Sequence, residues 1–127
     1  MTLTNLLAVF IGSGLGGMCR YLCSNYIQSF TPRAIFPWGT FAVNIIGCFI
    51  IGILYGLFDR NNICNPEMRL LLTVGFCGGF TTFSTFINEN YLLFSHSATN
   101  SLIALLYLLA SVFTGFIMLY LGHRLTA

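Results

Sequence analysis

Four long apolar stretches follow one another along the chain, and short polar segments separate them. The stretches cover residues 4–26, 38–58, 68–94 and 102–121. A helix needs about 20 apolar residues to cross the hydrocarbon core of a bilayer, so each stretch is long enough. Apolar and polar positions do not alternate as they do in barrel strands. Because backbone groups in lipid must bond within their own segment, the pattern predicts four transmembrane helices in a single domain, 1–127.

A cluster of glycine, hydroxyl and phenylalanine residues interrupts the third stretch, where residues 75–86 read GFCGGFTTFSTF. A straight helix over residues 68–94 would be about 40 Å long. The hydrocarbon core is about 30 Å thick, so such a helix must tilt or break. Gly78 and Gly79 favour a break, since glycine is a poor helix former, and the β-branched and hydroxyl residues after them tolerate non-helical backbone. We therefore predict that the third helix is broken near the midplane, as in many transporter ion sites.

Small residues also recur at helical spacing in the first three stretches. They form three pairs: Gly12 and Gly16, Gly52 and Gly56, and Gly75 and Gly79. Such pairs let two helix backbones approach closely, which promotes helix association in lipid. The pairs predict tight helix packing and do not by themselves indicate a ligand.

The composition agrees with a chain surrounded by lipid. Hydrophobic residues make up 57% and charged residues 6%, with a mean hydropathy of +0.86, whereas soluble domains carry roughly 25% charged residues. The net charge of +2 is too small and too dispersed for nucleic-acid binding. The odd count of five cysteines, most of them in apolar stretches, argues against a disulfide framework. We expect a multi-pass membrane protein whose principal surroundings are the lipid bilayer.

The arginines of the loops and helix ends indicate the orientation only weakly. Arg60, Arg69 and Arg124 belong to the side that holds both termini, and Arg33 belongs to the other side, with Arg20 directed toward it. Positive charge in loops sets orientation, so a weak bias permits insertion in both directions. A short four-helix chain of this kind predicts an antiparallel, dual-topology dimer with a two-fold axis in the membrane plane.

Polar side chains inside membrane spans are costly, which makes them candidates for function. The neutral hydrogen-bonding side chains of interest are Thr40, Asn44, Ser84, Thr85, Tyr107 and Ser111. The stretches contain no His, Asp or Lys, and their only carboxylate is Glu89. A proton-coupled carrier usually needs a titratable group at mid-depth, and a hydrolase needs a nucleophile with a base. The sequence therefore favours neither class.

These groups suit ions of two signs. Phe83 and Phe86 share one face of a helix, and the rim of an aromatic ring carries partial positive charge. Ring edges and neutral donors can replace the water around a small, strongly hydrated anion without holding it too tightly. Carbonyls near Gly78 and Thr81, freed by a break, suit a hard cation such as Na⁺. Ordinary helix packing stays open as an interpretation of each residue singly.

Four segments together resemble the small fluoride channels of the Fluc or CrcB family. They are GSGLGGMCRY at 12–21, PWGTFAVNIIGCFIIG at 37–52, GFCGGFTTFSTFINE at 75–89, and Tyr107 with Ser111 one turn later. The resemblance covers essentially the whole chain. It implies an antiparallel homodimer in the bacterial inner membrane that passively exports cytoplasmic fluoride through two antiparallel pores. It also implies one structural Na⁺ at the centre of the dimer.

The resemblance also implies roles for single residues. Carbonyls of Gly78 and Thr81 would hold the Na⁺. Arg20 would hold helix ends or attract anions at a vestibule, and Glu89 would act in a supporting position. The fluoride pore would be lined by Phe83, Phe86, Asn44, Ser111, Tyr107, Thr40, Ser84 and Thr85.

Three other interpretations stay open from the sequence. A small dual-topology multidrug exporter has a similar size, but such carriers have a glutamate in the first span, where this chain has Arg20. An assembly factor that transports nothing would use the small residues for packing only. A heterodimer with an unlike second subunit is the third, although the full set of motif residues favours a homodimer.

Overall fold

The computed structural model of the chain describes residues 1–61 and 65–127, and the regular elements in that part are all helices. The first two spans are α1 (Leu3–Ser29) and α2 (Trp38–Asn61), and the fourth is α6 (Ala98–Thr126). The third is divided into α3 (Pro66–Leu70), the π-helix η1 (Leu71–Cys77), α4 (Gly78–Phe80) and α5 (Phe83–His96). Within the described residues, four helical segments are long and apolar enough to cross a membrane, which confirms the predicted fold class of four transmembrane helices.

Side-chain caps explain where several helices begin. The Thr2 hydroxyl accepts a hydrogen bond from the Asn5 N–H, and the Asn65 side chain accepts one from the Met68 N–H, just before Pro66 at the first helical position. Ser97 alone separates α5 from α6, and its hydroxyl accepts from the Asn100 N–H. Such caps satisfy backbone donors that have no partner within the helix. Helix α6 therefore begins before its apolar stretch does.

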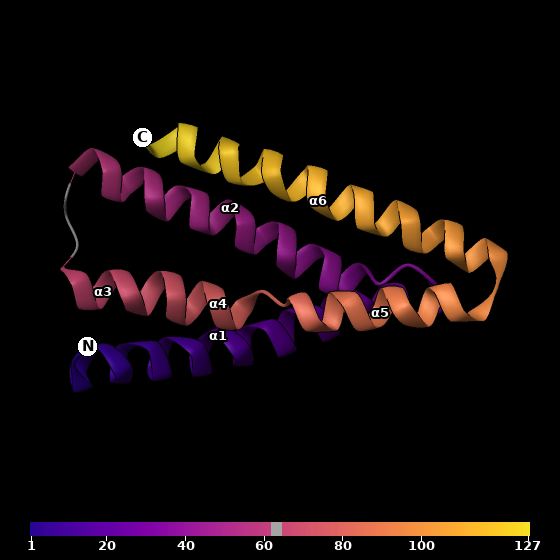
Figure 1. Cartoon of the computed structure of the whole chain (residues 1–127), viewed down its shortest axis with the longest axis horizontal. Helices are drawn as coiled ribbons and strands as arrows, with labels where there is room; N and C mark the ends of the chain where they lie inside the picture. The colour runs from indigo at the N-terminus through magenta and orange to yellow at the C-terminus, as the bar shows by residue number, and fades with distance from the viewer. Residues whose placement is uncertain (62–64) are drawn as a thin grey trace.

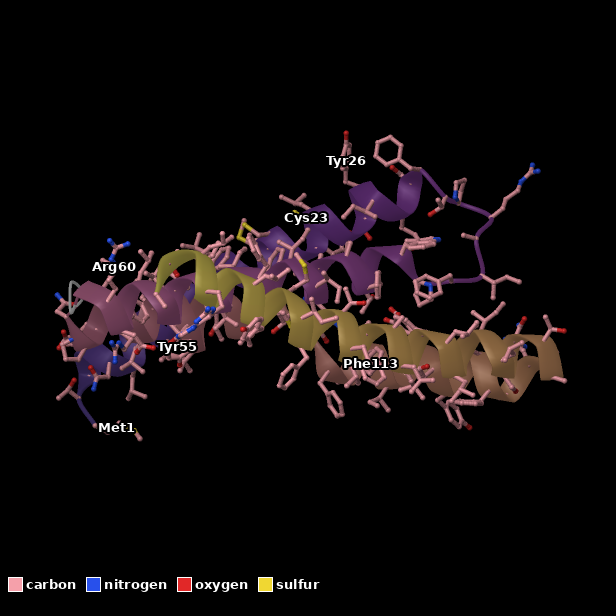
Figure 2. All side chains as sticks on the ribbon, turned by 90° about the horizontal axis from the view of Figure 1, so that it is seen from above. Met1, Cys23, Tyr26, Tyr55, Arg60 and Phe113 are labelled. Carbon is pink, nitrogen blue, oxygen red and sulfur yellow. The ribbon has the colours of Figure 1, made fainter. Side chains whose placement is uncertain are left out.

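The helices are arranged so that the third span changes its packing partner along its length (Figure 1). Helix α2 lies along α6, and α1 lies along α3, η1 and α4. Beyond the break, α5 packs on α6 instead. Both termini lie at one end of the molecule, together with the end of α2 and the start of α3 (Figure 1). Large apolar side chains such as Phe113 and Tyr26 project from the outside of the bundle, as expected for surfaces in lipid (Figure 2).

Backbone contacts through glycine close the seam between α1 and the first half of the third span. A Cβ atom on Gly16 would lie 2.1 Å from the carbonyl oxygen of Phe76, and one on Gly12 would lie 2.3 Å from that of Leu71. A Cβ on Gly79 would meet the Ser13 carbonyl oxygen at 2.4 Å. These distances leave no room for any side chain, which confirms the packing role predicted for the glycine pairs.

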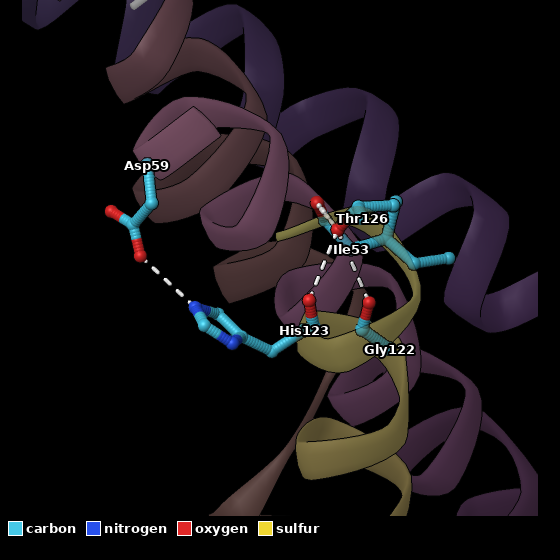
Figure 3. Close-up of polar contacts among 5 residues, drawn as sticks. All are labelled: Ile53, Asp59, Gly122, His123 and Thr126. Atoms are coloured by element: carbon cyan, nitrogen blue, oxygen red, sulfur yellow. Dashed lines mark hydrogen bonds and ion pairs between the residues drawn. The ribbon is translucent and has the colours of Figure 1, made fainter. Parts of the chain in front are cut away.

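The seam between α2 and α6 is closed in the same way. A Cβ on Gly52 would lie 2.2 Å from the Leu119 carbonyl oxygen. Near the C-terminus, the Thr126 hydroxyl donates to the carbonyl oxygen of Ile53 at 2.9 Å (Figure 3). Asp59 and His123 form an ion pair at 2.9 Å between the ends of the same two helices, on the exposed side (Figure 3). The pair of helices is thus joined by backbone contacts inside and by polar side chains at its end.

The third helix is broken as predicted, and the break lies at the threonines after the glycine pair, not at the glycines themselves. Gly78 and Gly79 are helical, whereas Thr81 and Thr82 adopt extended backbone angles, with ψ of 161° and 122°. The break lies about halfway along the span Pro66–His96. The glycines are needed where α1 approaches, and the threonines supply the side-chain bonds that an interrupted helix requires.

Candidate functional site

The broken segment is held by hydrogen bonds from its own threonines. The N–H of Thr81 donates to the Cys77 carbonyl at 3.0 Å, and its hydroxyl donates to the same oxygen at 2.8 Å. The Thr82 hydroxyl accepts from the Thr85 N–H at 3.2 Å and so caps α5. Hydroxyl side chains therefore end α4 and start α5 within two residues.

Asn44 of α2 clamps the backbone of Thr82 from outside the helix. The Asn44 amide nitrogen donates to the Thr82 carbonyl at 3.1 Å, and the Thr82 N–H donates to the Asn44 carbonyl oxygen at 2.8 Å. An asparagine amide has one acceptor and two N–H donors. One N–H of Asn44 stays available after this clamp. The structure thus places Asn44 on the backbone of the break, beside the proposed ion path.

The clamp changes which backbone carbonyls are free. In a continuous helix the Thr82 N–H would bond the Gly78 carbonyl. Here that N–H is donated to Asn44, and the Thr85 N–H, the helical partner of the Thr81 carbonyl, is donated to the Thr82 hydroxyl. The Thr81 carbonyl instead accepts from Arg20 Nη1 of α1 at 3.3 Å. The break therefore exposes the carbonyl oxygens of Gly78 and Thr81 to new partners.

A groove of about 620 Å³ runs beside the break between α2, the third span and α6. The predicted site residues that line it are Asn44, Gly78, Thr81, Phe83, Phe86 and Ser111. The Ser111 hydroxyl is shielded from solvent, and no described residue lies within hydrogen-bonding distance of it. Its O–H is therefore unpaired within the described chain, in the wall of the groove. Residues from three spans thus meet where the sequence predicted an ion path.

The two phenylalanines at the start of α5 differ in their surroundings. Their ring centroids lie 6.3 Å apart. Phe86 is buried and meets the ring of Tyr107 edge-on at 4.9 Å. Phe83 is 75% exposed and points away from the subunit's own core. One ring is fixed by packing within the chain, whereas the other is free to meet a second protein surface.

Glu89 of α5 forms a second polar cluster with Thr40 and Tyr107, called the Glu89 group below. One carboxylate oxygen accepts from the Thr40 hydroxyl of α2, and the other accepts from the Tyr107 hydroxyl of α6 at 3.0 Å. Thr40 and Tyr107 are themselves buried. Phe36 packs edge-on against Tyr107 at 5.1 Å and shields this group from the loop side. Three spans are therefore joined through a single carboxylate.

The remaining predicted residues lie elsewhere. Arg20 and Thr85 line a smaller cavity of about 230 Å³, which also reaches Thr40. Ser84 is exposed and lines neither this cavity nor the groove. The structure thus distributes the predicted residues other than Ser84 over the groove, the Glu89 group and the Arg20 cavity.

Thr82 is the residue that the sequence argument missed. It accepts from Thr85, donates its N–H to Asn44 and lines both the groove and the Arg20 cavity. A signal was present, because a threonine directly before the first residue of an apolar helical run is a typical helix N-cap.

The fold and this arrangement define a class of protein: a multi-pass membrane protein whose broken helix borders a groove lined from three spans. Comparison with known families matches residues 7–123 to the family described as "CrcB-like protein, Camphor Resistance (CrcB)". The chain belongs to this family.

Curated relatives carry a more specific name. A protein of Phocaeicola vulgatus is 48% identical over 120 residues, which is 93% of this chain and 94% of the relative. One from Gloeothece citriformis is 44% identical over 117 residues, and one from Flavobacterium psychrophilum is 40% identical over 114 residues. These cover 92% and 90% of this chain, and the same shares of the relatives. Each of the three is named "Fluoride-specific ion channel FluC".

Proposed function

We propose that this protein is a fluoride-specific ion channel of the bacterial inner membrane, through which cytoplasmic fluoride leaves passively. The observation that carries the proposal is the groove at the broken third helix, where ring edges, neutral donors and an unpartnered hydroxyl meet. A negative-inside potential favours anion exit by about 2.3 kcal/mol per 100 mV, so no energy-coupling residue is required. The family membership and the names of the relatives favour a channel over a multidrug exporter or an enzyme.

The channel would be an antiparallel homodimer with two pores. Phe83 and Gly78 are both exposed on the single chain, although they border the groove. A Cβ on Gly78 would meet nothing closer than 3.9 Å within the chain. A glycine inside a helix costs about 1 kcal/mol relative to alanine, so its presence without an internal contact favours a close approach by a second subunit.

A structural Na⁺ would lie at the centre of the dimer, held by the carbonyls of Gly78 and Thr81 from both subunits. The donor set fits this ion, because the break frees carbonyl oxygens and hard cations take oxygen ligands. The ion would supply a link between the two broken helices. The protein's own part is to hold the carbonyls in place through Asn44, Thr82 and the helix α4.

The fluoride path would use residues of the groove and then those of the Glu89 group. Phe83 and Phe86 would present ring edges, and Asn44 and Ser111 would offer an N–H and an O–H. Further along α5, the path would continue past Glu89 with its two hydroxyl partners. Thr40, Tyr107, Ser84 and Thr85 complete the proposed polar track.

Fluoride efflux from liposomes that contain the purified protein tests the proposal, with chloride efflux measured in parallel. We expect rapid fluoride release and no chloride release. Phe83→Ile, which removes an aromatic edge at an exposed position, should reduce fluoride release strongly, whereas Phe113→Ile on the lipid-facing side of α6 should not. A folded dimer that releases no fluoride would contradict the homodimeric channel and point to a missing second subunit or to the packing-only interpretation.

A further inference from the structure

Arg20 places a positive charge directly on the broken segment. Its Nη1 atom donates to the Thr81 carbonyl at 3.3 Å, across 61 positions of sequence. The guanidinium lines the cavity of about 230 Å³ described above. The polar side chains around it there are those of Tyr21, Ser24, Asn25, Thr40, Thr82 and Thr85, all of them neutral. This arginine therefore reaches the break from α1, through a cavity that shares Thr82 with the groove.

No carboxylate in the described part of the chain neutralises this charge. The ion pair found there joins Asp59 to His123, at the end of the bundle that holds the termini. The acidic group closest in the hydrogen-bond network is Glu89, because it bonds Thr40, which lines the Arg20 cavity. Both oxygens of Glu89 are occupied, by Thr40 and Tyr107. Among the described residues, Arg20 therefore has no carboxylate as a direct partner, and its hydrogen bond goes to the backbone of the break.

The carbonyl that Arg20 holds is also a proposed ligand of the Na⁺. A carbonyl oxygen has two lone pairs, so the Thr81 oxygen can accept from Arg20 and still face a cation on its other side. The guanidinium and the bound cation would then share one oxygen atom. Two positive charges at such close range repel each other, and the repulsion is proportional to the product of the charges. A divalent ion would therefore experience twice the repulsion of Na⁺.

We propose that Arg20 determines the cation selectivity of the site at the centre of the dimer. Its fixed charge keeps Na⁺ binding moderate and excludes Ca²⁺ and Mg²⁺, which the same carbonyl oxygens would otherwise accept. Arg20 is a positioning and selectivity residue, since it acts through the Thr81 carbonyl. This inference rests on the proposed Na⁺ site and adds to it the origin of its selectivity.

Cation-dependent stabilisation of the full-length dimer tests this role without measuring fluoride transport. A bound cation raises the unfolding temperature, and the concentration that gives half of the effect reports its affinity. The titrations use NaCl and CaCl₂, with choline chloride to keep the ionic strength constant. For Arg20→Gln we expect the half-effect concentration of Na⁺ to fall about tenfold. Because the repulsion doubles with the ion's charge, that of Ca²⁺ should fall by the square of this factor, about a hundredfold.

Two control variants separate the charge from a structural contribution. Arg20→Lys keeps a positive charge and should retain the preference for Na⁺ over Ca²⁺. Arg33→Gln removes an exposed loop arginine and should leave both titrations unchanged. A residue with a merely structural role would lower the unfolding temperature in all salts and leave the ratio of the two half-effect concentrations as it was.

The outcomes that overturn the inference are distinct from failure of the proposed function. If Na⁺ stabilises the wild type and Arg20→Gln keeps the wild-type ratio, the role of Arg20 is wrong and the Na⁺ site stands. If Na⁺ does not stabilise the wild type, both the proposed cation site and the role of Arg20 are wrong. The channel function is then still tested by the fluoride efflux measurement. If Arg20→Gln does not fold, Arg20→Met replaces it in the same titrations. A ratio of the Na⁺ and Ca²⁺ half-effect concentrations that equals the wild-type ratio in Arg20→Met overturns the inference.

Discussion

The first half of the third span has two sides that are built in opposite ways. Toward α1, glycine backbones touch and the seam is closed, with carbonyl oxygens in the space that a Cβ would need. Toward α2, the same segment borders a groove of about 620 Å³ that Asn44, Thr81 and Ser111 line. The closed side fixes the position of the helix in lipid, where no hydrophobic force between helices exists. The open side can therefore keep polar groups that are not paired within the chain.

The largest loss of stability is expected when one methyl group is added on the closed side. Gly16→Ala would force a Cβ to within 2.1 Å of the Phe76 carbonyl oxygen. We expect a loss of roughly 3 kcal/mol or more in the free energy of unfolding, because backbone atoms must move. Gly14→Ala is the matched control, since a Cβ there meets nothing within 4 Å. Unfolding midpoints in detergent would measure both, and equal midpoints would show that the seam is not closed as described.

A smaller loss of stability is expected on the open side when the Asn44 clamp at the break is removed. Asn44→Ala would leave the N–H and the carbonyl of Thr82 without their partners. We expect a loss of about 1–3 kcal/mol, faster hydrogen exchange at Thr82 and reduced fluoride efflux. Asn88→Ala, an exposed asparagine of α5, serves as the control. Unchanged exchange at Thr82 in Asn44→Ala would mean that Asn44 does not hold the break.

Gly78 tests whether the open side faces a second subunit. Gly78→Ala has room within the chain and improves the helix propensity, so the single subunit should fold as well as before. If the partner approaches there, the dissociation constant of the dimer should rise at least about tenfold, which is 1.4 kcal/mol. Subunit exchange between fluorescently labelled proteins in liposomes would measure it. An unchanged dissociation constant would show that the second subunit does not approach Gly78, and the proposed two-fold axis would then have to lie elsewhere.

The smallest effect is expected at the ion pair between α2 and α6, far from both sides of the third span. Asp59 is exposed, and exposed ion pairs contribute little because water screens them. Asp59→Asn should change the unfolding free energy by less than about 1 kcal/mol and leave fluoride efflux as in the wild type. A larger loss would show that the helix ends are held by this pair and not by the glycine contacts of the seam.

The location of the break shows what the helix propensity of single residues can and cannot predict. Glycine propensity predicted a break at Gly78 and Gly79, yet both are helical. The break lies at Thr81 and Thr82 because Asn44, more than 30 positions away in the chain, supplies both hydrogen bonds that the interrupted backbone needs. Propensity ranks the cost of each residue in a helix, but it does not say where a distant partner will reduce that cost.

The sequence by itself determined the four membrane spans, the close-packed glycines and the residue types of the site. These depend on length, hydropathy and spacing, which lipid makes decisive because the backbone must bond within each span. Only the tertiary structure decided how the polar residues divide among the groove, the Glu89 group and the Arg20 cavity. It also decided that Arg20 reaches the Thr81 carbonyl and that Ser84 lies apart. Such pairings depend on how whole helices rotate and cross, and the order of residues within one helix does not contain that information.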